Sequence, residues 1–381
     1  MGRWVHTWAS APQLTEPENL PPHARDGLVL AGSTLRQTVR VSAGGERLRL
    51  RFSNAFGTAP LRLAAVTVAL PVDGRAGGSA VVPKTLRAVT FHGRPTASVP
   101  AGAQVVSDPL EFSLADGAVL AVTLRLAEGL DPAGVTSHPG SRTTSHLAVG
   151  DQTGRAELTG ATPVEHWYLL SGVEVEASVP VLALIGDSLT DGRGSTTNHN
   201  DRWPDQLFDR LGGFAVANQA AGGNRVLNDG LGQNALARLD RDILALSGVR
   251  WLVVFEGVND LGTAPAEDQE DVAADLIAAY EQIAVRAHAH DILVYGATLT
   301  PFGGHDYDDP AGHRESARQK INTWIRTSGT FDAVLDFDQA VRDPSNPRRL
   351  LPSYDVGDHL HLSPTGYHAL ANAFPAHLLK A

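Results

Sequence analysis

The sequence contains no cysteine. A disulfide framework, a thiolate nucleophile and a cysteine-based zinc site are therefore excluded. No stretch approaches the roughly 18 consecutive apolar residues that a transmembrane helix needs. The opening residues, Met1-Gly2-Arg3-Trp4, also lack the basic-then-apolar pattern of a signal peptide. On the sequence as given we expect a cytoplasmic protein without membrane insertion, or a secreted one whose signal peptide has been removed.

Basic residues are fewer than acidic ones. Lys and Arg number 31 against 42 Asp and Glu, which gives a formal net charge of -11 at pH 7. A negatively charged protein repels nucleic-acid phosphates and anionic lipid head groups, so nucleic acid is not an expected partner. At 381 residues the chain exceeds the size at which one core usually keeps growing. We therefore expect two domains.

Residues 1–178 carry the pattern of a β-rich domain. Short stretches with alternating or β-branched residues are separated by Gly, Pro, Asn and Asp, and they show no helical period. The predicted strands are 35–41, 47–53, 61–70, 87–91, 119–126 and 145–149. Many short strands with frequent turns indicate a β-sandwich of the jelly-roll kind. Trp4 and Trp8 could form a sugar-stacking platform, but we favour burial in the core of this accessory domain.

Residues 179–381 change to alternating strands and helices. The predicted strands are 181–185, 215–218, 251–255, 292–295 and 333–336. The clearest helix is predicted over 267–290, because its apolar residues repeat at spacings of three and four. A closing helix is predicted over 364–379. Repeated strand–helix units predict an α/β domain with a parallel sheet and helices on both faces.

A serine follows the most apolar of these strands. After residues 181–185 come Gly186-Asp187-Ser188-Leu189, which read as a turn into a helix. Ser188 is thus placed at the carboxyl end of a central strand, where ligands bind in open parallel sheets. Ser188 could be a simple helix cap. As a nucleophile it would need a base and a group that orients the base.

Both groups are present near the carboxyl terminus. Asp358 and His361 lie three residues apart, so one tight turn can place the carboxylate against the imidazole. His359 is the competing base. We favour His361, because a spacing of three suits a turn better than adjacency does.

Two other strand ends offer hydrogen-bond donors for an oxyanion. Gly222 and Gly223 follow the strand at 215–218, and glycine lets a backbone N–H approach a ligand closely. Asn259 follows the strand at 251–255, and its amide can donate to the same point.

These segments together resemble the four ordered blocks of the GDSL or SGNH hydrolase family. The matching residues are Gly186-Asp187-Ser188-Leu189, Asn218 with Gly223 five residues on, Gly257-x-Asn259-Asp260, and Asp358-x-x-His361. The resemblance implies a flavodoxin-like three-layer α/β/α domain over 179–381. Residues 4–12 and 53–57 are similar to a subgroup of bacterial SGNH esterases with an amino-terminal β-sandwich.

The resemblance also implies a role for each residue. Ser188 would be the nucleophile, His361 the base and Asp358 the residue that orients it. The oxyanion donors would be the backbone N–H groups of Ser188 and Gly223 and the side chain of Asn259. Because Gly222 directly precedes Gly223, the sequence does not decide which of the two glycines supplies this backbone N–H. No metal or organic cofactor is required.

The expected activity is hydrolysis of short-acyl, acetyl-type esters on a small alcohol or a carbohydrate, through an acyl-serine intermediate. A lysophospholipase or thioesterase would use the same triad on longer chains. A glycan-binding protein with an inactive hydrolase domain is the alternative of another class. A phosphate or nucleotide binder is disfavoured, because the first turn lacks a glycine-rich phosphate loop.

Two further features leave the hydrolase interpretation unchanged. Several polar residues between 305 and 313 superficially suggest a metal loop, but their spacing fits no standard site and we expect a solvated loop. They are His305, Asp306, Asp308, Asp309 and His313. Arg202-Trp203 either lines the substrate pocket or packs the first helix of the domain.

Overall fold

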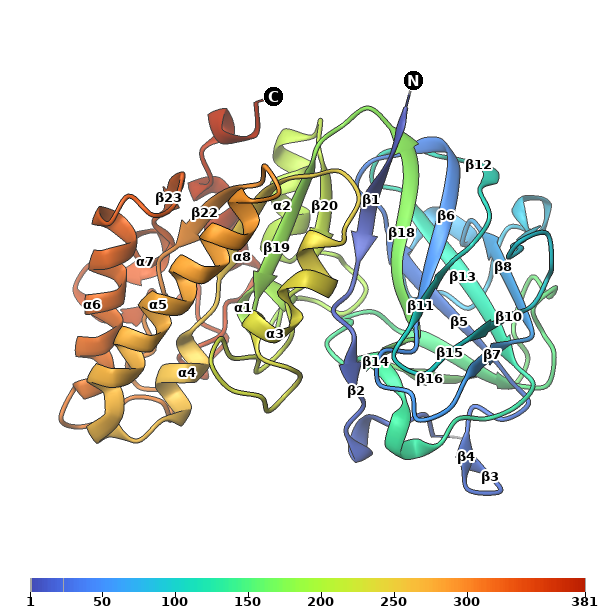
Figure 1. Cartoon of the computed structure of the whole chain (residues 1–381), viewed down its shortest axis with the longest axis horizontal. Coiled ribbons are helices and arrows are strands. Elements are labelled where there is room, and N and C mark those ends of the chain that lie inside the picture. Colours follow the sequence, from blue (N-terminus) through green and yellow to red (C-terminus); the bar gives the residue numbers. More distant parts are fainter. Residues whose placement is uncertain (1, 23, 381) are drawn as a thin grey trace. The chain divides into compact units, whose positions relative to one another are not determined.

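The structure, a computed structural model, describes residues 2–22 and 24–380. They divide into two units. The amino-terminal unit runs up to Ser178 and includes Thr197–Asn200, and the carboxyl-terminal unit comprises Val179–Thr196 and the chain from Asp201 onward. The first consists mostly of antiparallel strands and the second is built on a parallel sheet, which confirms the predicted fold class (Figure 1).

Two antiparallel sheets form most of the amino-terminal unit, as in a sandwich. The first has the order β1-β18-β6-β11, with β12 also paired to β6. Its strands are β1 (Arg3–Ala9), β18 (Leu170–Ala177), β6 (Gly45–Ser53), β11 (Gln104–Val106) and β12 (Leu110–Leu114). The second has the order β16-β15-β5-β13-β8-β9. Its strands are β16 (Thr162–Val164), β15 (Ser145–Val149), β5 (Ser33–Arg40), β13 (Val119–Leu126), β8 (Ala65–Ala69) and β9 (Arg87–Ala88).

Short pairings complete this unit. They join β2 (Gln13–Leu14), β14 (Thr136–His138) and β17 (Trp167–Tyr168), then β7 (Leu61–Leu63) with β10 (Ala97–Val99), and β3 (Ala24–Arg25) with β4 (Leu28–Val29). The prediction of one continuous strand over 61–70 is wrong, because this segment forms two strands, β7 and β8. Of the predicted strand at 87–91, only β9 is a regular strand, and Phe91 forms an isolated bridge with Arg94.

Strand β6 shows why the sequence folds as a sandwich here. Its residues alternate between the two faces of the sheet, as the pleat requires. Leu48, Leu50 and Phe52 are buried in the core. The alternate positions are arginines, and Arg49 and Arg51 both form ion pairs with the buried Glu174.

The two early tryptophans occupy different environments. Trp8 is only 7% exposed and packs edge-on against Trp167, with ring centroids 4.9 Å apart. This agrees with the core interpretation. Trp4 is partly exposed, and the guanidinium of Arg49 lies over its ring, 4.6 Å from the centroid. That arrangement is a cation–π contact within one sheet.

The carboxyl-terminal unit contains a parallel sheet of order β20-β19-β21-β22-β23. Numbered along the chain, this is the order 2-1-3-4-5 of flavodoxin-like folds. The strands are β19 (Val181–Gly186), β20 (Ala215–Asn218), β21 (Val249–Phe255), β22 (Leu293–Ala297) and β23 (Ala333–Leu335). All five predicted strands are found within two residues of their predicted ends. Every residue of β19 is buried, as expected for a strand covered on both faces.

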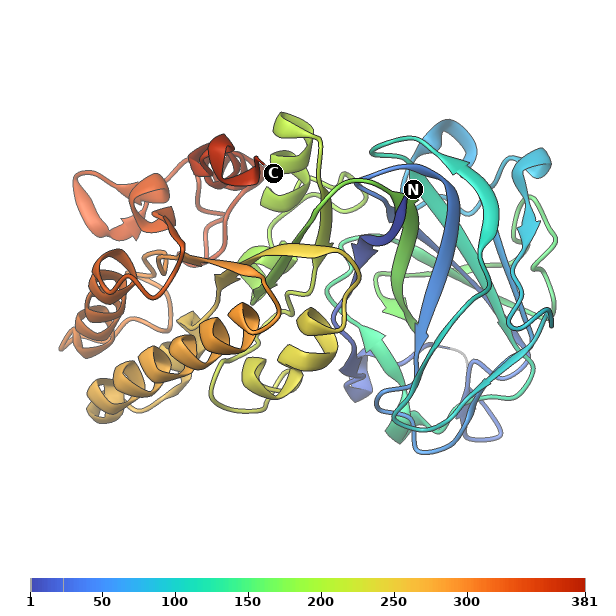
Figure 2. The same ribbon diagram turned by 45° about the horizontal axis from the view of Figure 1, so that its top comes forward.

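Helices form the two outer layers of this unit. They are α1 (Ser188–Asp191), α2 (Trp203–Leu211), α3 (Ala235–Leu239), α4 (Val258–Thr263), α5 (Gln269–His288), α6 (His313–Thr327), α7 (Phe337–Val341) and α8 (Pro364–Ala373). Helices α4, α5 and α6 contact one another, and α8 contacts α2 and α7. Figure 2 shows α5 in light orange and the red closing segment on opposite sides of the strands. In the described part of the chain, no helix combines the length and apolarity that crossing a bilayer requires.

Two predicted helices need corrected ends. The helix predicted over 267–290 begins at Gln269, after a 3₁₀ turn at Ala266–Asp268. The closing helix ends at Ala373, and a separate 3₁₀ turn follows at Ala376–Leu379. Pro375 between them accounts for the break, because proline disfavours the helical conformation of the residue before it.

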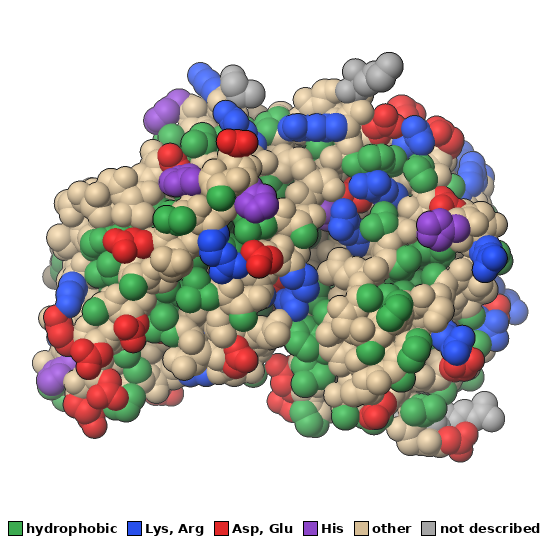
Figure 3. Space-filling model, in the orientation of Figure 1, with side chains coloured by type: hydrophobic (Ala, Val, Ile, Leu, Met, Phe, Trp, Pro, Cys, Tyr) green, Lys and Arg blue, Asp and Glu red, His purple; other side chains and the backbone are tan. Residues whose placement is uncertain are grey.

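Acidic side chains gather where α5 begins, at the lower left of Figure 3. Glu267, Asp268, Glu270 and Asp271 are all exposed there. The last turn of the helix carries Arg286 and His288 instead. This distribution of charge favours the helix, because its amino terminus is the positive end of the dipole.

The two faces of α5 predict opposite responses to truncation. Ile283 is 0% exposed and Val285 is 62% exposed on the same helix. We expect Ile283→Ala to lower the free energy of unfolding by about 2 to 5 kcal/mol, because it removes buried methyl groups and leaves a cavity. Val285→Ala is the matched control and should change stability by less than about 0.5 kcal/mol. Urea denaturation followed by far-ultraviolet circular dichroism measures both, and equal losses would contradict the assignment of the buried face.

Candidate active site

A tight turn at the end of β19 presents Ser188. At Gly186 a Cβ atom would lie 2.7 Å from the carbonyl oxygen of Phe255, so no larger residue fits there. The next residue, Asp187, caps α1 by accepting the backbone N–H of Leu189 at 2.9 Å. Burial raises the pKa of this carboxyl to about 7. Ser188 is therefore the first residue of a short helix that starts directly at the sheet edge.

The side chains of Ser188, His361 and Asp358 form one hydrogen-bonded row. Ser188 Oγ lies 2.8 Å from His361 Nε2. On the other side of the imidazole, His361 Nδ1 lies 2.7 Å from Asp358 Oδ2. This contact gives Nδ1 the proton and leaves Nε2 as the acceptor for the serine hydroxyl. The arrangement is that of a nucleophile, a base and a group that orients the base.

The charges in this row are fixed by its hydrogen bonds and by burial. Burial works against ionisation of Asp358, but donation from the backbone N–H and imidazole of His361 and from Leu360 outweighs it and lowers the pKa to about 2. Burial lowers the pKa of His361 below its ordinary value, although the Asp358 carboxylate opposes this shift. The imidazole is thus neutral at neutral pH, and the carboxylate is charged.

The competing histidine has a different partner. His359 Nδ1 lies 2.7 Å from Asp355 Oδ2, and the backbone N–H of His359 donates to Asp355 Oδ1. His359 also adopts a left-handed backbone conformation, with φ of 65°. The histidine within hydrogen-bond distance of Ser188 is therefore His361.

The two neighbouring glycines are distinguished by their backbone N–H groups. Gly222 donates to Asp191 Oδ2 at 3.1 Å, so its N–H is already used. Within 2–22 and 24–380, no acceptor binds the N–H of Gly223. Gly223 has φ of +71°, and a Cβ there would lie 2.4 Å from the side chain of Leu231. The donor available to a ligand is therefore that of Gly223.

Asn259 is held at both ends of its side-chain amide. Its Nδ2 donates to the backbone carbonyl of Asn224 at 2.8 Å. Its Oδ1 accepts the hydroxyl of Tyr307 at 2.9 Å. The amide is buried, and one of its two N–H bonds remains for a ligand. Ser188 also retains its backbone N–H, since the first residues of a helix have no acceptor within it.

A buried network that the sequence analysis missed lies behind these donors. Asn224 Oδ1 accepts Arg238 Nε at 2.9 Å, and Arg238 Nη1 donates to the carbonyl of Gln219. Arg238 Nη2 lies 3.6 Å from Glu256 Oε2. Burial raises the pKa of Glu256 to about 8. Arg238 is buried in α3 together with the apolar residues Ala235 and Leu239. A charged residue among the buried apolar positions of a helix is the sequence signal that could have predicted this network.

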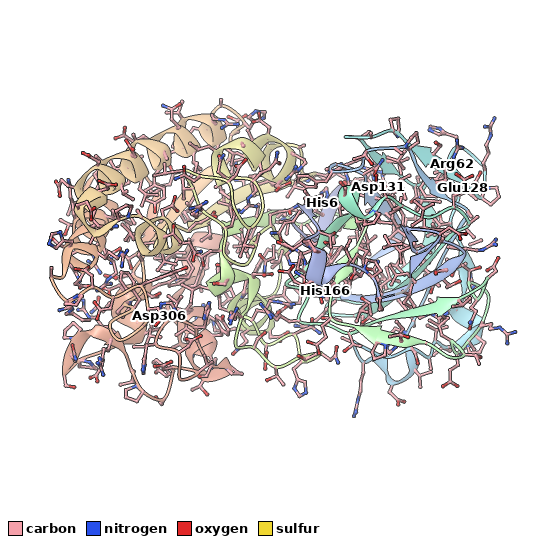
Figure 4. The ribbon with its side chains drawn as sticks, turned by 90° about the horizontal axis from the view of Figure 1, so that it is seen from below. His6, Arg62, Glu128, Asp131, His166 and Asp306 are labelled. Atoms are coloured by element: carbon pink, nitrogen blue, oxygen red, sulfur yellow. The ribbon has the colours of Figure 1, made fainter. Side chains whose placement is uncertain are left out.

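The polar loop and the Arg202-Trp203 pair also have structural partners. The loop is mostly exposed or half-buried, as expected for a solvated loop, and Asp309 is its buried exception. Asp309 accepts the backbone N–H groups of His313 and Arg314. Asp306, labelled in Figure 4, lies in the carboxyl-terminal unit. In the part of the chain that the structure describes, His, Asp and Glu form no group of three arranged to hold a metal. Trp203 lies in the core, and its Nε1 donates to Thr190 Oγ1 at 3.1 Å.

Comparison with known proteins identifies the domain that carries this site. Residues 184–369 match the model of the GDSL-like Lipase/Acylhydrolase family. No curated protein matches the chain.

Solved structures resemble about half of the chain. A GDSL-like lipase from Bacteroides thetaiotaomicron VPI-5482 is 20% identical with a TM-score of 0.37, over 51% of this chain and 84% of that one. Axe2, an acetylxylan esterase from Geobacillus stearothermophilus, is 20% identical with a TM-score of 0.39, over 52% and 93% of the two chains. LAE5, an alpha/beta hydrolase enzyme from the metagenome of Lake Arreo, is 18% identical with a TM-score of 0.39, over 53% and 97%. Likenesses this distant decide nothing about the substrate.

The environment of His361 predicts its titration. We expect the imidazole to titrate with a midpoint below pH 6.5, the ordinary value, because burial disfavours its charged form. Asp358→Asn should lower the midpoint further, because the carboxylate is the group that raises it. Asp355→Asn is the matched control and should leave the midpoint unchanged, since Asp355 pairs with His359. Proton NMR of the imidazole signals measures these midpoints, with the His361 signal identified by its loss in His361→Asn. A higher midpoint in Asp358→Asn would contradict the pairing.

Proposed function

Residues 184–369 form a GDSL-like lipase/acylhydrolase domain, and we propose that the chain is a serine esterase that hydrolyses short-acyl esters. The observation that carries this proposal is the hydrogen-bonded row from Ser188 Oγ through the imidazole of His361 to Asp358. In this row the serine hydroxyl contacts a neutral base, and the base contacts a carboxylate on its other side. That combination activates a serine for attack on a carbonyl carbon.

The proposed reaction has two halves. Ser188 Oγ attacks the carbonyl carbon of the ester while His361 Nε2 takes the hydroxyl proton. The tetrahedral intermediate collapses, the bond to the alcohol oxygen breaks, and His361 returns the proton to the departing alcohol. A water molecule then attacks the acyl-serine with His361 again as the base, releasing the carboxylic acid and restoring the serine hydroxyl.

Each half places negative charge on the former carbonyl oxygen. The backbone N–H groups of Ser188 and Gly223 and the free Nδ2 hydrogen of Asn259 are the proposed donors to it. All three belong to segments fixed by other bonds, so they need little reorganisation when the charge develops. No step of this reaction uses a metal ion or an organic cofactor.

The polar surroundings of the site favour small substrates. Arg193 and His305 are close enough to influence the pKa of His361, and Arg193 and Arg225 both influence that of Tyr307. Charged and imidazole groups near the base disfavour a long alkyl chain, because burial of these groups against the chain would remove their hydration. They suit an acetyl-type group on a polar alcohol such as a carbohydrate.

Two other functions use the same residues differently. A lysophospholipase or thioesterase would require long acyl chains to react best. A glycan-binding protein with an inactive hydrolase domain would leave Ser188 unreactive. The hydrogen bonds from Ser188 through His361 to Asp358 argue against the second, because the nucleophile, the base and the orienting carboxylate are all present and in contact.

Covalent labelling tests the nucleophile. An organophosphonate should form one adduct per chain, located on Ser188 by peptide mass spectrometry. Ser188→Ala should lose the adduct and at least about a thousandfold of kcat for an aryl acetate, because no other group replaces the attacking oxygen. Ser316→Ala is the matched control, since this serine is exposed on α6. Labelling that persists in Ser188→Ala would place the nucleophile elsewhere.

A series of aryl esters from acetyl to palmitoyl tests the substrate class. We expect kcat/KM to be highest for acetyl or butyryl and to fall with each longer chain, because the charged groups near His361 must lose hydration against the added methylenes. A maximum at long chains would support the lysophospholipase or thioesterase alternative instead.

A further inference from the structure

Tyr307 reaches the proposed oxyanion donors from the segment between β22 and α6. Its hydroxyl donates to Asn259 Oδ1 at 2.9 Å. Its backbone N–H donates to His305 Nδ1 at 3.0 Å, and the two rings meet edge-on with centroids 4.6 Å apart. The ring covers Gly262 of α4, where a Cβ atom would lie 2.2 Å from ring carbons. Tyr307 is thus fixed by its backbone, by its ring and by its hydroxyl.

The contacts of Asn259 define which way its amide faces. The two ends of an asparagine amide have nearly the same shape, so only their partners distinguish them. The carbonyl of Asn224 can only accept, which requires Nδ2 on that side. Oδ1 then faces Tyr307, whose hydroxyl can donate. With both ends satisfied, the remaining N–H of Nδ2 has one fixed direction.

The hydroxyl of Tyr307 also has the right ionisation state for this role. Burial raises the pKa of Tyr307 above its ordinary value of 10.0, so the group remains a donor throughout the neutral range. Donation to Oδ1 draws electron density from the amide and strengthens its N–H groups as donors. A phenylalanine would keep the ring over Gly262 and remove only this effect.

We propose that Tyr307 is a positioning residue, whose hydroxyl orients and polarises the amide of Asn259 so that it stabilises the oxyanion of the proposed ester hydrolysis. This inference rests on the proposed esterase function. Tyr307 acts through Asn259 and therefore should affect the rate of the chemical step rather than the binding of the ester.

A double-mutant cycle tests this inference. Tyr307→Phe should lower kcat for an aryl acetate about tenfold, the effect of one neutral hydrogen bond, and change KM by less than about twofold. In an Asn259→Ala background, the same change should produce no further loss of kcat, because the amide through which it acts is gone. Tyr295→Phe is the matched control. Its hydroxyl donates to the carbonyl of Leu378 at 2.8 Å, away from the site, so kcat should not change.

A second variant displaces the ring without removing the hydroxyl. Gly262→Ala places a methyl group where the ring of Tyr307 lies, in a helix that alanine otherwise favours. It should lower kcat when Asn259 is present and have no further effect in Asn259→Ala, because the amide through which Tyr307 acts is then gone. This comparison does not use Tyr307→Phe, so it keeps the test valid if Tyr307→Phe lowers the melting temperature.

The outcomes separate this inference from the proposed function. Equal losses of kcat from Tyr307→Phe with and without Asn259, or no loss at all, would overturn the role of Tyr307 while leaving Ser188-dependent hydrolysis intact. A rise in KM with unchanged kcat would also overturn it, because it would indicate substrate binding. A wild-type protein without ester turnover or a phosphonate adduct would overturn the proposed function and this inference together.

Discussion

One hydrogen bond joins the beginning and the end of the carboxyl-terminal unit. Ser188 Oγ and His361 Nε2 meet at 2.8 Å although 173 residues separate them in the chain. Only a fold that returns its last segment to the edge where its first strand ends can make this contact. The parallel sheet does so, because the carboxyl ends of all its strands lie at one edge. The first strand, β19, lies between β20 and β21 and is buried along its whole length, so the nucleophile directly follows a fully packed strand.

The proposed oxyanion donors depend on polar groups buried behind them. Asn224 links two of the strand ends, since its carbonyl binds Asn259 and its side chain binds Arg238. Arg238 in turn holds the carbonyl of Gln219, just before the glycine pair. Burying an arginine and several carboxylates is costly for stability. In return, the network fixes the segments that carry the proposed donors, as stabilisation of developing charge requires.

The sequence predicted the strands of the carboxyl-terminal unit closely, because a fully buried strand has a continuous apolar pattern that few other elements share. Residues such as Ser188 and Asn259 could be predicted because they directly follow such strands. The arrangement of Gly222 and Gly223 could not, since either glycine fits the turn and only the bond from Gly222 to Asp191 distinguishes them. Tyr307 gave no sequence signal, because it lies in a loop whose path depends on tertiary contacts.

The carboxylates of this unit show how similar side chains acquire different tasks. Asp358 accepts three hydrogen bonds and has a pKa of about 2, so it remains a charged partner for His361. Glu256 is buried with no hydrogen-bond donor to either oxygen among the described residues, and its pKa is about 8. The difference follows from the number of donors that face each group, because burial alone raises both. A carboxylate that must support a base at neutral pH therefore belongs in a turn rich in N–H groups, as the segment before His361 is.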